Sequence, residues 1–272
     1  MRFDSLCEII TAVHLSVYVT GPFEQRGGLM LVAPPGHLKT TAAEILQEYE
    51  RTLVVSDVTV KTLTAMRDDL LGGNVYTLIF SDYGKIHKRH GSVASNIEGI
   101  VMGLVGEGFR KAAFSDQRIQ ALPARAAVIG CVTTKFAEKM EETWLDDGFY
   151  RRFLWCRYRV RDPEYLENAI AQWRKAEIDG SLTIRIPSNR TIPYRLEAED
   201  VARLRYDLRF MRDKKLPLMM AQKIMCVLKW KFDKQDPALA RNIWKDFAPS
   251  LMPDGAVLDV KERKEASSAH GK

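Results

Sequence analysis

The sequence predicts an α/β protein with an open parallel β-sheet, helices on both faces of that sheet, and a smaller, mainly helical C-terminal region. Three observations lead to this prediction. Four short segments between residues 27 and 134 are apolar without polar alternation, as strands buried on both faces are. Segments with helical spacing of apolar residues separate them, which favours parallel strands joined by helices. After about residue 160, charged and amphipathic stretches replace the strand-like segments.

The expected elements alternate along the first half of the chain. A helical or mixed apolar segment over 6–19 comes first. Strands are expected within 27–36, 52–57, 75–82 and 125–134, and helices between them at 39–51, 59–73 and 92–108. Gly72 and Gly73 mark the end of the middle helix. The C-terminal region is expected to hold a polar helix over 161–180, an extended segment over 181–197, and amphipathic helices over 198–215 and 217–235.

Length and composition fit an ordinary globular protein. The 272 residues are enough for one ample domain with a small appendage, and the fractions of 46% hydrophobic and 28% charged residues are typical. No apolar run reaches the ~18 residues of a membrane span, and no signal-peptide pattern opens the chain, so a cytoplasmic protein is expected. The scattered cysteines favour buried small side chains over a disulfide framework or a zinc site; they are Cys7, Cys131, Cys156 and Cys226.

The stretch LVAPPGHLKTT, residues 31–41, joins the first expected strand to a helix. A strand, a loop and a lysine–threonine pair at the start of a helix form the context of a phosphate-binding loop. The free N–H groups at a helix N-terminus suit a phosphate. Lys39 would add a cation for the β and γ phosphates, and the Thr40 hydroxyl would complete a magnesium shell. The alternative is an ordinary strand-to-helix turn that contains Lys-Thr.

The sequence APPGHLKT resembles the GPPGxGKT loop of AAA+ ATPases, and also the looser loop of the replicative MCM helicases. Ala33 and Leu38 stand where the general pattern has glycine. The resemblance implies a P-loop NTPase core of the AAA+/RecA-like type, with ATP and Mg²⁺ as ligands. The residues that would hold the nucleotide are Pro35, Gly36, His37, Leu38, Lys39, Thr40 and Thr41.

The segment VYTLIFSDYGKI, residues 75–86, resembles a Walker B strand, in which apolar residues lead to an acid that holds magnesium. Asp82 takes this position and would form the metal site together with Thr40. The AAA+ pattern has Asp-Glu, whereas this chain has a single acid followed by Tyr83, which weighs against fast hydrolysis. Asp57 would either assist Asp82 or cap the helix over 59–73, and capping is the preferred interpretation.

The strand AAVIGCVTTKF, residues 126–136, matches the position of the AAA+ sensor strand, which ends in a polar residue near the γ phosphate. Thr133 and Thr134 fit this role, and Thr133 is preferred. The alternative is a threonine that serves only the structure at a strand end.

The segment LDDGFYRRFLWCRYRV, residues 145–160, resembles the arginine-finger segment of phage and plasmid helicase-like ATPases and of MCM proteins. Arg152 takes the position of the finger, which stabilises transition-state charge at the nucleotide of a neighbouring subunit. Arg151 is the second candidate. The alternative is a salt-bridged arginine on a basic strand. The resemblance therefore assigns catalytic roles to Lys39, Asp82, Thr133 and Arg152.

Contact with DNA is suggested by position and charge. The formal net charge of +6 permits contact with nucleic acid without requiring it. The same helicase-like families carry a hairpin before the sensor strand, and residues 107–128 fit that hairpin. Arg110, Lys111 and Arg118 would then touch DNA in a central pore, and solvated charge is an equal alternative. Arg203 or Arg205 would serve as a second sensor in the helical region.

The expected organisation is an N-terminal helical segment (1–27), an ATPase core (28–162), a mainly helical lid-like region (163–252) and a disordered tail (253–272). The resemblance implies an ATP-hydrolysing, helicase-like motor that acts in DNA replication or processing of a phage or other mobile element, in the host cytoplasm. It would work as a homo-oligomeric ring, expected to be a hexamer, with DNA and a replication protein as partners. Two alternatives stay open: a nucleotide-dependent assembly switch or helicase loader with little hydrolysis, and a DNA-binding scaffold with a vestigial loop.

Overall fold

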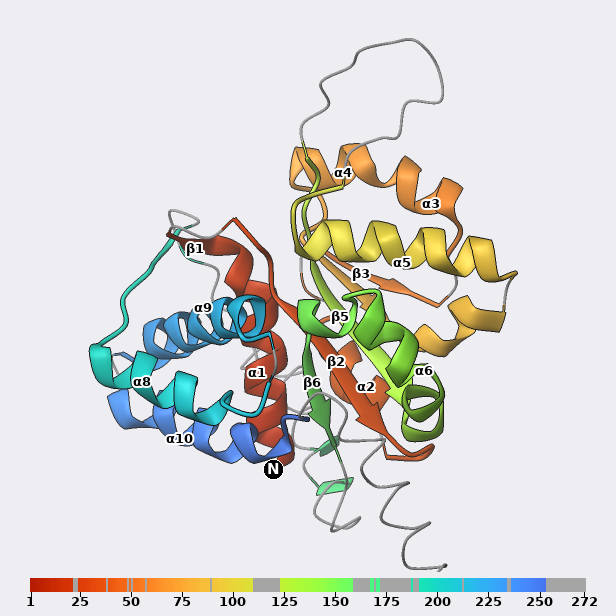
Figure 1. Ribbon diagram of the computed structural model, residues 1–272. Coiled ribbons are helices and arrows are strands. Elements are labelled where there is room, and N and C mark those ends of the chain that lie inside the picture. Colours follow the sequence, from red (N-terminus) through yellow and green to blue (C-terminus); the bar gives the residue numbers. More distant parts are fainter. Residues whose placement is uncertain are drawn as a thin grey trace, which may run out of the picture.

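A five-stranded sheet, in which every strand runs parallel to its neighbours, forms the centre of the protein (Figure 1). The strands are β2 (Gly28–Ala33), β3 (Thr52–Val55), β4 (Thr77–Phe80), β5 (Ala127–Thr133) and β6 (Leu154–Arg157), in the spatial order β3-β4-β5-β2-β6. The computed structural model describes the chain except for residues 22–23, 38, 48, 50, 57, 89, 110–122, 159–166, 169, 172–186, 188–190, 212, 234–235 and 253–272.

The central strands are apolar because helices cover both of their faces. Every residue of β2 and β4 is buried, and β5 is buried as far as Val132. The edge strand β3 is only half-buried. This burial pattern confirms the predicted α/β class with a covered parallel sheet.

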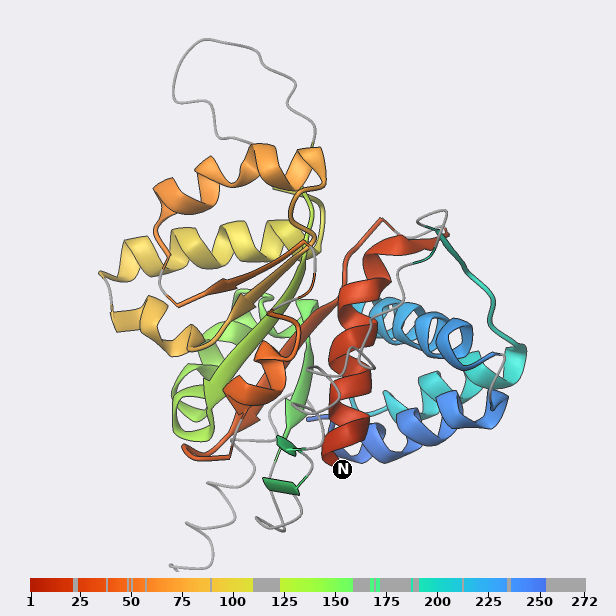
Figure 2. The ribbon, with the colours of Figure 1, turned by 180° about the vertical axis from the view of Figure 1, so that it is seen from behind.

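Two groups of helices cover the sheet. The helices of the first half are α1 (Phe3–Leu15), α2 (Lys39–Glu44), α3 (Val60–Ala65), α4 (Arg67–Gly72), α5 (Gly91–Val105) and α6 (Thr134–Asp146). Helices α1 and α2 contact each other and the strands β2 and β5, and they lie toward the viewer in Figure 2. Helices α5 and α6 cover the opposite face, together with the short helix η2 (Tyr83–Lys88) that follows β4.

Several helix boundaries differ from the sequence-based expectation. The helix expected over 39–51 ends at Glu44, and tight turns lead to Arg51, whose φ is +69° at the entry to β3. The helix expected over 59–73 divides into α3 and α4 at Met66. Its N-cap is Thr59, whose hydroxyl accepts from the Thr62 amide at 3.0 Å. The N-cap position thus belongs to Thr59, and the role predicted for Asp57 lies outside the described residues.

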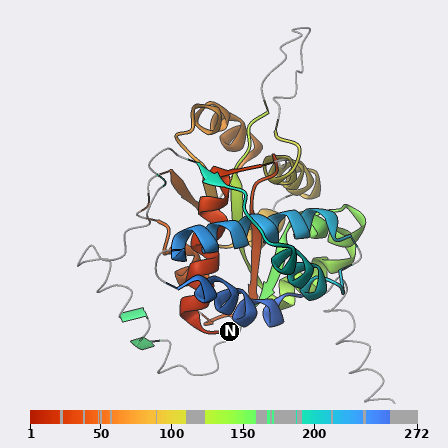
Figure 3. The same ribbon diagram turned by 90° about the vertical axis from the view of Figure 1, so that its left-hand side faces the viewer.

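The C-terminal helices form a bundle with the first helix of the chain. They are α8 (Ala198–Asp207), α9 (Lys215–Phe232) and α10 (Pro237–Phe247). Helix α1 packs on both α9 and α10 while also contacting the sheet, and Figure 3 shows these helices in front of the sheet. A two-stranded parallel pair, β1 (Val19–Thr20) with β7 (Ile192–Pro193), adds a further link. Buried residues of both parts belong to one continuous core.

The cysteine prediction is confirmed, since all four cysteines are buried and free. Two helices that the sequence reasoning did not anticipate, α6 and α10, complete the fold among the described residues. Within the described ranges, no helix is both long and apolar enough to cross a membrane. The tail over 253–272 and most of the polar segment over 161–180 fall outside the part of the chain that the structure describes.

Candidate functional site

The candidate site lies at the carboxyl ends of β2, β5 and β4. The chain leaves β2 through α2 on one face of the sheet and leaves the adjacent β5 through α6 on the other face (Figures 1 and 2). Their carboxyl ends lie side by side, because Ala33 pairs with Thr133 in register. Ligands bind open α/β sheets at such points, where neighbouring connections diverge.

The loop after β2 has the features of a tight turn. Gly36 has a φ of +79°, which favours glycine, and a Cβ at this position would meet no atom within 4 Å. Pro35 and Gly36 are exposed, while His37, Lys39 and Thr40 are partly buried. Helix α2 begins at Lys39 but has only 6 residues. Its dipole is therefore weaker than that of the helix expected from the sequence.

Thr40 connects the loop to the segment that follows β4. The Thr40 hydroxyl donates a hydrogen bond to the Ser81 carbonyl at 3.2 Å. Asp82 is the next residue and is partly buried. Gly84 gives the carboxylate room, because a Cβ on Gly84 would stand 3.3 Å from Asp82 Oδ1. The hydrogen bond thus ties Thr40 to the residue directly before Asp82, the acid with which it was predicted to share a metal ion.

Cys131 lies between the loop and the acid, a position that the sequence reasoning missed. Its thiol donates to the Lys39 carbonyl at 3.4 Å. Burial raises the pKa of this thiol to about 12; the Glu44 and Asp82 carboxylates also raise it, whereas Lys39 and the Thr40 hydroxyl lower it. The charges of Lys39 and Asp82 therefore both influence the pKa of this buried thiol, in opposite directions. The sequence did contain a sign of this position. Cys131 is two residues before Thr133, and side chains two residues apart lie on the same face of a strand.

Thr133 has a structural role in addition to its predicted one. It is the N-cap of α6, and its hydroxyl oxygen accepts from the Phe136 amide at 3.3 Å. An accepting hydroxyl keeps its own O–H free to donate. Capping and a contact to a phosphate are therefore compatible, and the two roles proposed from the sequence do not exclude each other.

A buried polar pair fixes the segment that carries Asp82. In η2, His87 Nε2 lies 2.8 Å from Glu98 Oε1 of α5, and Trp144 Nε1 of α6 donates to the same oxygen at 2.6 Å. Tyr83, directly after Asp82, is fully buried and has ring contacts with Phe80 and Trp144. Helices from both sides of η2 therefore hold the residue after the acid inside the core.

Arg152 lies at the opposite end of the sheet, in the short helix η3 (Tyr150–Arg152) before β6. A Cβ on Gly28, the first residue of β2, would stand 2.9 Å from the Arg152 carbonyl oxygen. From Gly28 to Ala33 the strand spans about 17 Å. The Arg152 guanidinium donates to the Gly148 carbonyl and to the Glu107 carboxylate, each at 3.1 Å. Within one chain it does not reach the loop after β2.

The other arginines proposed from the sequence occupy separate places. Arg151 is half-exposed and forms an ion pair with Asp213 at 3.2 Å. Arg203 donates to Asp207 within α8, and Arg205 is exposed on the same helix. Figure 1 places α8 away from the sheet edge that holds the loop. The proposed site residues Leu38, Arg110, Lys111 and Arg118 lie outside the described residues.

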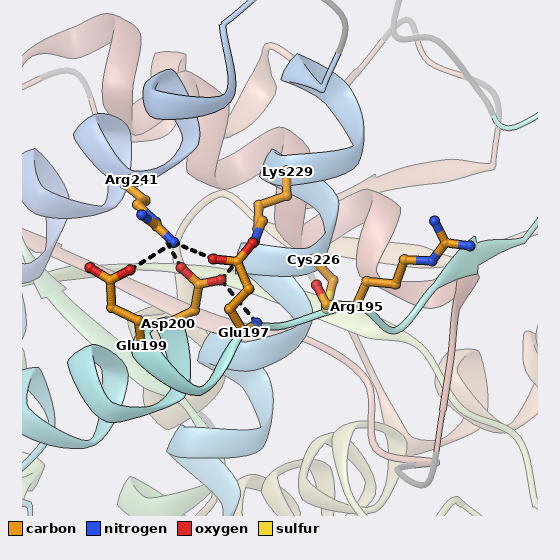
Figure 4. A network of polar contacts seen from close by, with 7 residues as sticks. All are labelled: Arg195, Glu197, Glu199, Asp200, Cys226, Lys229 and Arg241. Atoms are coloured by element: carbon orange, nitrogen blue, oxygen red, sulfur yellow. Dashed lines mark hydrogen bonds and ion pairs between the residues drawn. The ribbon is translucent and has the colours of Figure 1, made fainter.

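The C-terminal bundle contains its own charged network (Figure 4). The buried Asp200 carboxylate accepts from Lys229 at 2.7 Å and from Arg241 at 2.9 Å. Glu197 also pairs with both cations, and its amide donates to Asp200 in a capping box of α8. Burial opposes ionisation of Asp200, but the hydrogen bonds from Lys229, the Glu197 amide and Arg241 hold its pKa below the usual value of 3.8. The network ties together α8, α9 and α10.

No family model matches the chain, and no curated protein matches its sequence. Among the described residues, no group of three or more His, Cys, Asp or Glu side chains could hold a metal ion by itself.

Proposed function

We propose that the protein is an ATPase of the AAA+ type, helicase-like, that binds ATP with Mg²⁺ at the carboxyl edge of its sheet. Two hydrogen bonds just beyond the carboxyl ends of three adjacent strands carry this proposal. The Thr40 hydroxyl bonds to the Ser81 carbonyl, directly before Asp82, and the Cys131 thiol bonds to the Lys39 carbonyl. In this proposal the protein acts in DNA replication or processing of a phage or other mobile element. DNA, a replication protein and further copies of the chain are its proposed partners.

The chemistry of the site residues suits this ligand. Backbone N–H groups of a turn bind phosphate oxygens, and the open surroundings of Gly36 leave room for a phosphate close to the backbone. The Lys39 ammonium would offset the phosphate charge. A hydroxyl and a carboxylate, from Thr40 and Asp82, are the hard oxygen donors that Mg²⁺ prefers. The bound metal would neutralise charge on the phosphates, and Asp82 would orient water or metal there.

The position of Arg152 supports a ring in which each copy completes the site of its neighbour. The guanidinium lies at the amino edge of the sheet, about 17 Å along the strand direction from the loop after β2. An arginine side chain spans less than half of that distance. If Arg152 acts on a nucleotide, that nucleotide belongs to another copy of the chain. A homo-oligomeric ring, with a hexamer as the proposed form, meets this requirement.

A nucleotide-dependent switch with little hydrolysis is the second candidate. The residue after Asp82, where the AAA+ pattern has glutamate, is Tyr83, and its ring is fully buried in the aromatic cluster. No carboxylate follows Asp82 to activate water. Slow turnover together with ATP-dependent assembly would identify this variant of the proposal.

ATP binding and hydrolysis by the purified chain test the proposal. Affinity for a fluorescent ATP analogue and turnover with and without single-stranded or double-stranded DNA are measured for wild type, Lys39→Ala and Asp82→Asn. The control is Lys139→Ala, an exposed lysine on α6. We expect Lys39→Ala to lose binding, Asp82→Asn to bind without turnover, and the control to match wild type. Failure of the wild type to bind the analogue would refute the proposal and leave the DNA-binding scaffold as the better account.

A further inference from the structure

Four cations gather at the amino edge of the sheet, the end opposite the proposed nucleotide site. Arg26 lies two residues before β2, Arg125 two residues before β5, and Arg152 two residues before β6, while Lys223 comes from α9. Arg26 and Arg125 lie close enough to Lys223 to lower its pKa to about 8, after the larger effect of burial. The ammonium of Lys223 donates to a backbone carbonyl, that of Gln25, at 2.6 Å.

The described carboxylates that pair with this cluster are few and exposed. Glu24 pairs with Arg125 at 2.5 Å, and Glu107 pairs with Arg152 at 3.1 Å. The two glutamate side chains are 75% and 76% exposed, whereas the two arginine side chains are 19% and 14% exposed. Four largely buried cations thus face two solvated carboxylates. Uncompensated buried charge is unfavourable, so the cluster is expected to favour a further anion.

One residue holds both arginines. Arg125 Nη2 donates to the Glu107 carbonyl at 3.1 Å, and Arg152 Nη2 donates to the Glu107 carboxylate at 3.1 Å. The Nε atoms of both arginines are buried and have no hydrogen-bond partner among the described residues. Because these Nε donors are buried, an incoming anion has to bind through the Nη groups. Glu107 contacts both guanidinium groups and so holds them next to each other.

We propose that Arg125 joins Arg152 in binding the γ phosphate of ATP held by the neighbouring copy of the chain. Glu107 holds both arginines in the isolated chain: its carbonyl keeps Arg125, and its carboxylate gives up Arg152 to the phosphate on assembly. This inference rests on the proposed function. A guanidinium matches phosphate oxygens through two parallel N–H donors, and the charge of a terminal phosphate offsets the excess of the cluster. In the isolated chain the Glu24 and Glu107 carboxylates occupy donors that the phosphate takes on assembly.

Mixing of inactive variants tests whether Arg125 acts across an interface. Arg125→Ala is expected to bind the fluorescent ATP analogue as wild type does, to hydrolyse ATP at least tenfold more slowly, and to unfold in urea in one cooperative transition as wild type does. Lys39→Ala is expected to be inactive because it does not bind ATP in its own site. Mixed subunits combine an intact Lys39 site in one copy with an intact Arg125 in its neighbour, so activity is expected to return. Arg125→Lys keeps the charge without the fork and is expected to recover only part of the rate.

Glu107→Gln supplies a second measurement that does not depend on turnover. The substituted side chain would keep an amide oxygen for Arg152 but would remove the competing charge. We expect ATP-dependent assembly, followed by light scattering, at a protein concentration about two- to fivefold lower than for wild type. ATP binding with no effect of Arg125→Ala on turnover or assembly would overturn this inference alone. A mixture of Arg125→Ala and Lys39→Ala that stays inactive would also overturn this inference alone. If the wild type does not bind ATP, the proposed function is overturned as well.

Discussion

Replacement of Lys223 by methionine is expected to stabilise the protein at neutral pH. The side chain is 2% exposed, and burial, Arg26 and Arg125 lower its pKa from the usual 10.5 to about 8. Each difference of one between the folded and unfolded pKa values corresponds to about 1.4 kcal/mol. The buried charge therefore costs about 3 kcal/mol at pH 7. Methionine keeps the apolar stem but leaves the Gln25 carbonyl without its donor, which costs about 1 kcal/mol, so the net gain is about 2 kcal/mol.

The change of this stability difference with pH is a second, independent test of the same prediction. Below pH 8 the lysine is protonated in both the folded and the unfolded state, so its contribution does not change. Between pH 8 and 10.5 the unfolded chain binds more protons, so the stability of the wild type should rise by about 3 kcal/mol relative to Lys223→Met.

Urea unfolding at pH 7, 8.5 and 10 measures the free energy of unfolding of wild type and of Lys223→Met. The difference between the two values cancels the contributions of groups that titrate in both proteins. The gain from Lys223→Met should be largest at pH 7 and should shrink as the pH rises. A variant that is less stable than wild type at pH 7, or a difference that does not change with pH, would refute the reasoning. Such a result would mean that the ammonium is well compensated in the folded chain.

Two further predictions concern other buried polar groups. Burial lowers the pKa of His14 to about 4 from the usual 6.5, so wild-type stability should fall by about 3 kcal/mol between pH 6.5 and 4; His14→Leu should flatten this part of the curve in urea unfolding, and an unchanged slope would contradict the assignment. Asp200→Asn should lose about 2 kcal/mol at pH 7, because the buried carboxylate that Lys229 and the half-exposed Arg241 share loses its charge. The exposed Glu199, which also contacts Arg241, is the control, and Glu199→Gln should change stability by less than about 0.5 kcal/mol; equal losses would show that the buried carboxylate is not central.

The order of strands and helices in the first half of the chain could be predicted from the sequence, because apolar periodicity is a local property. The order of strands across the sheet could not. Nothing local in 127–133 indicates that this strand separates β2 from β4. Helix ends were also beyond local reasoning: apolar spacing extended the helix to Arg51, but α2 ends at Glu44 and turns lead from there to the positive φ of Arg51.

The candidate site likewise has features that could be predicted from the sequence and features that could not. The loop and Asp82 were proposed from motif positions, and the structure joins Thr40 to the residue directly before that acid. Their assignment to ATP and Mg²⁺ stays a prediction. The buried Cys131 beneath the loop and the Glu107 bridge between Arg125 and Arg152 depend on residues from separate strands and turns. Such contacts arise from tertiary packing, which a single sequence does not reveal.

The packing of α1 between the sheet and the C-terminal helices has a consequence for how the protein unfolds. The sequence suggested that residues 1–27 and 163–252 were separate from the sheet domain. In the structure α1 packs on the sheet and on α9 and α10 at once, within one continuous core. Removing either neighbour would expose the apolar surface of α1, so the two parts share their cooperativity. Calorimetry should therefore record one transition, with equal calorimetric and van't Hoff enthalpies, rather than the two steps of a domain with a freely hinged lid.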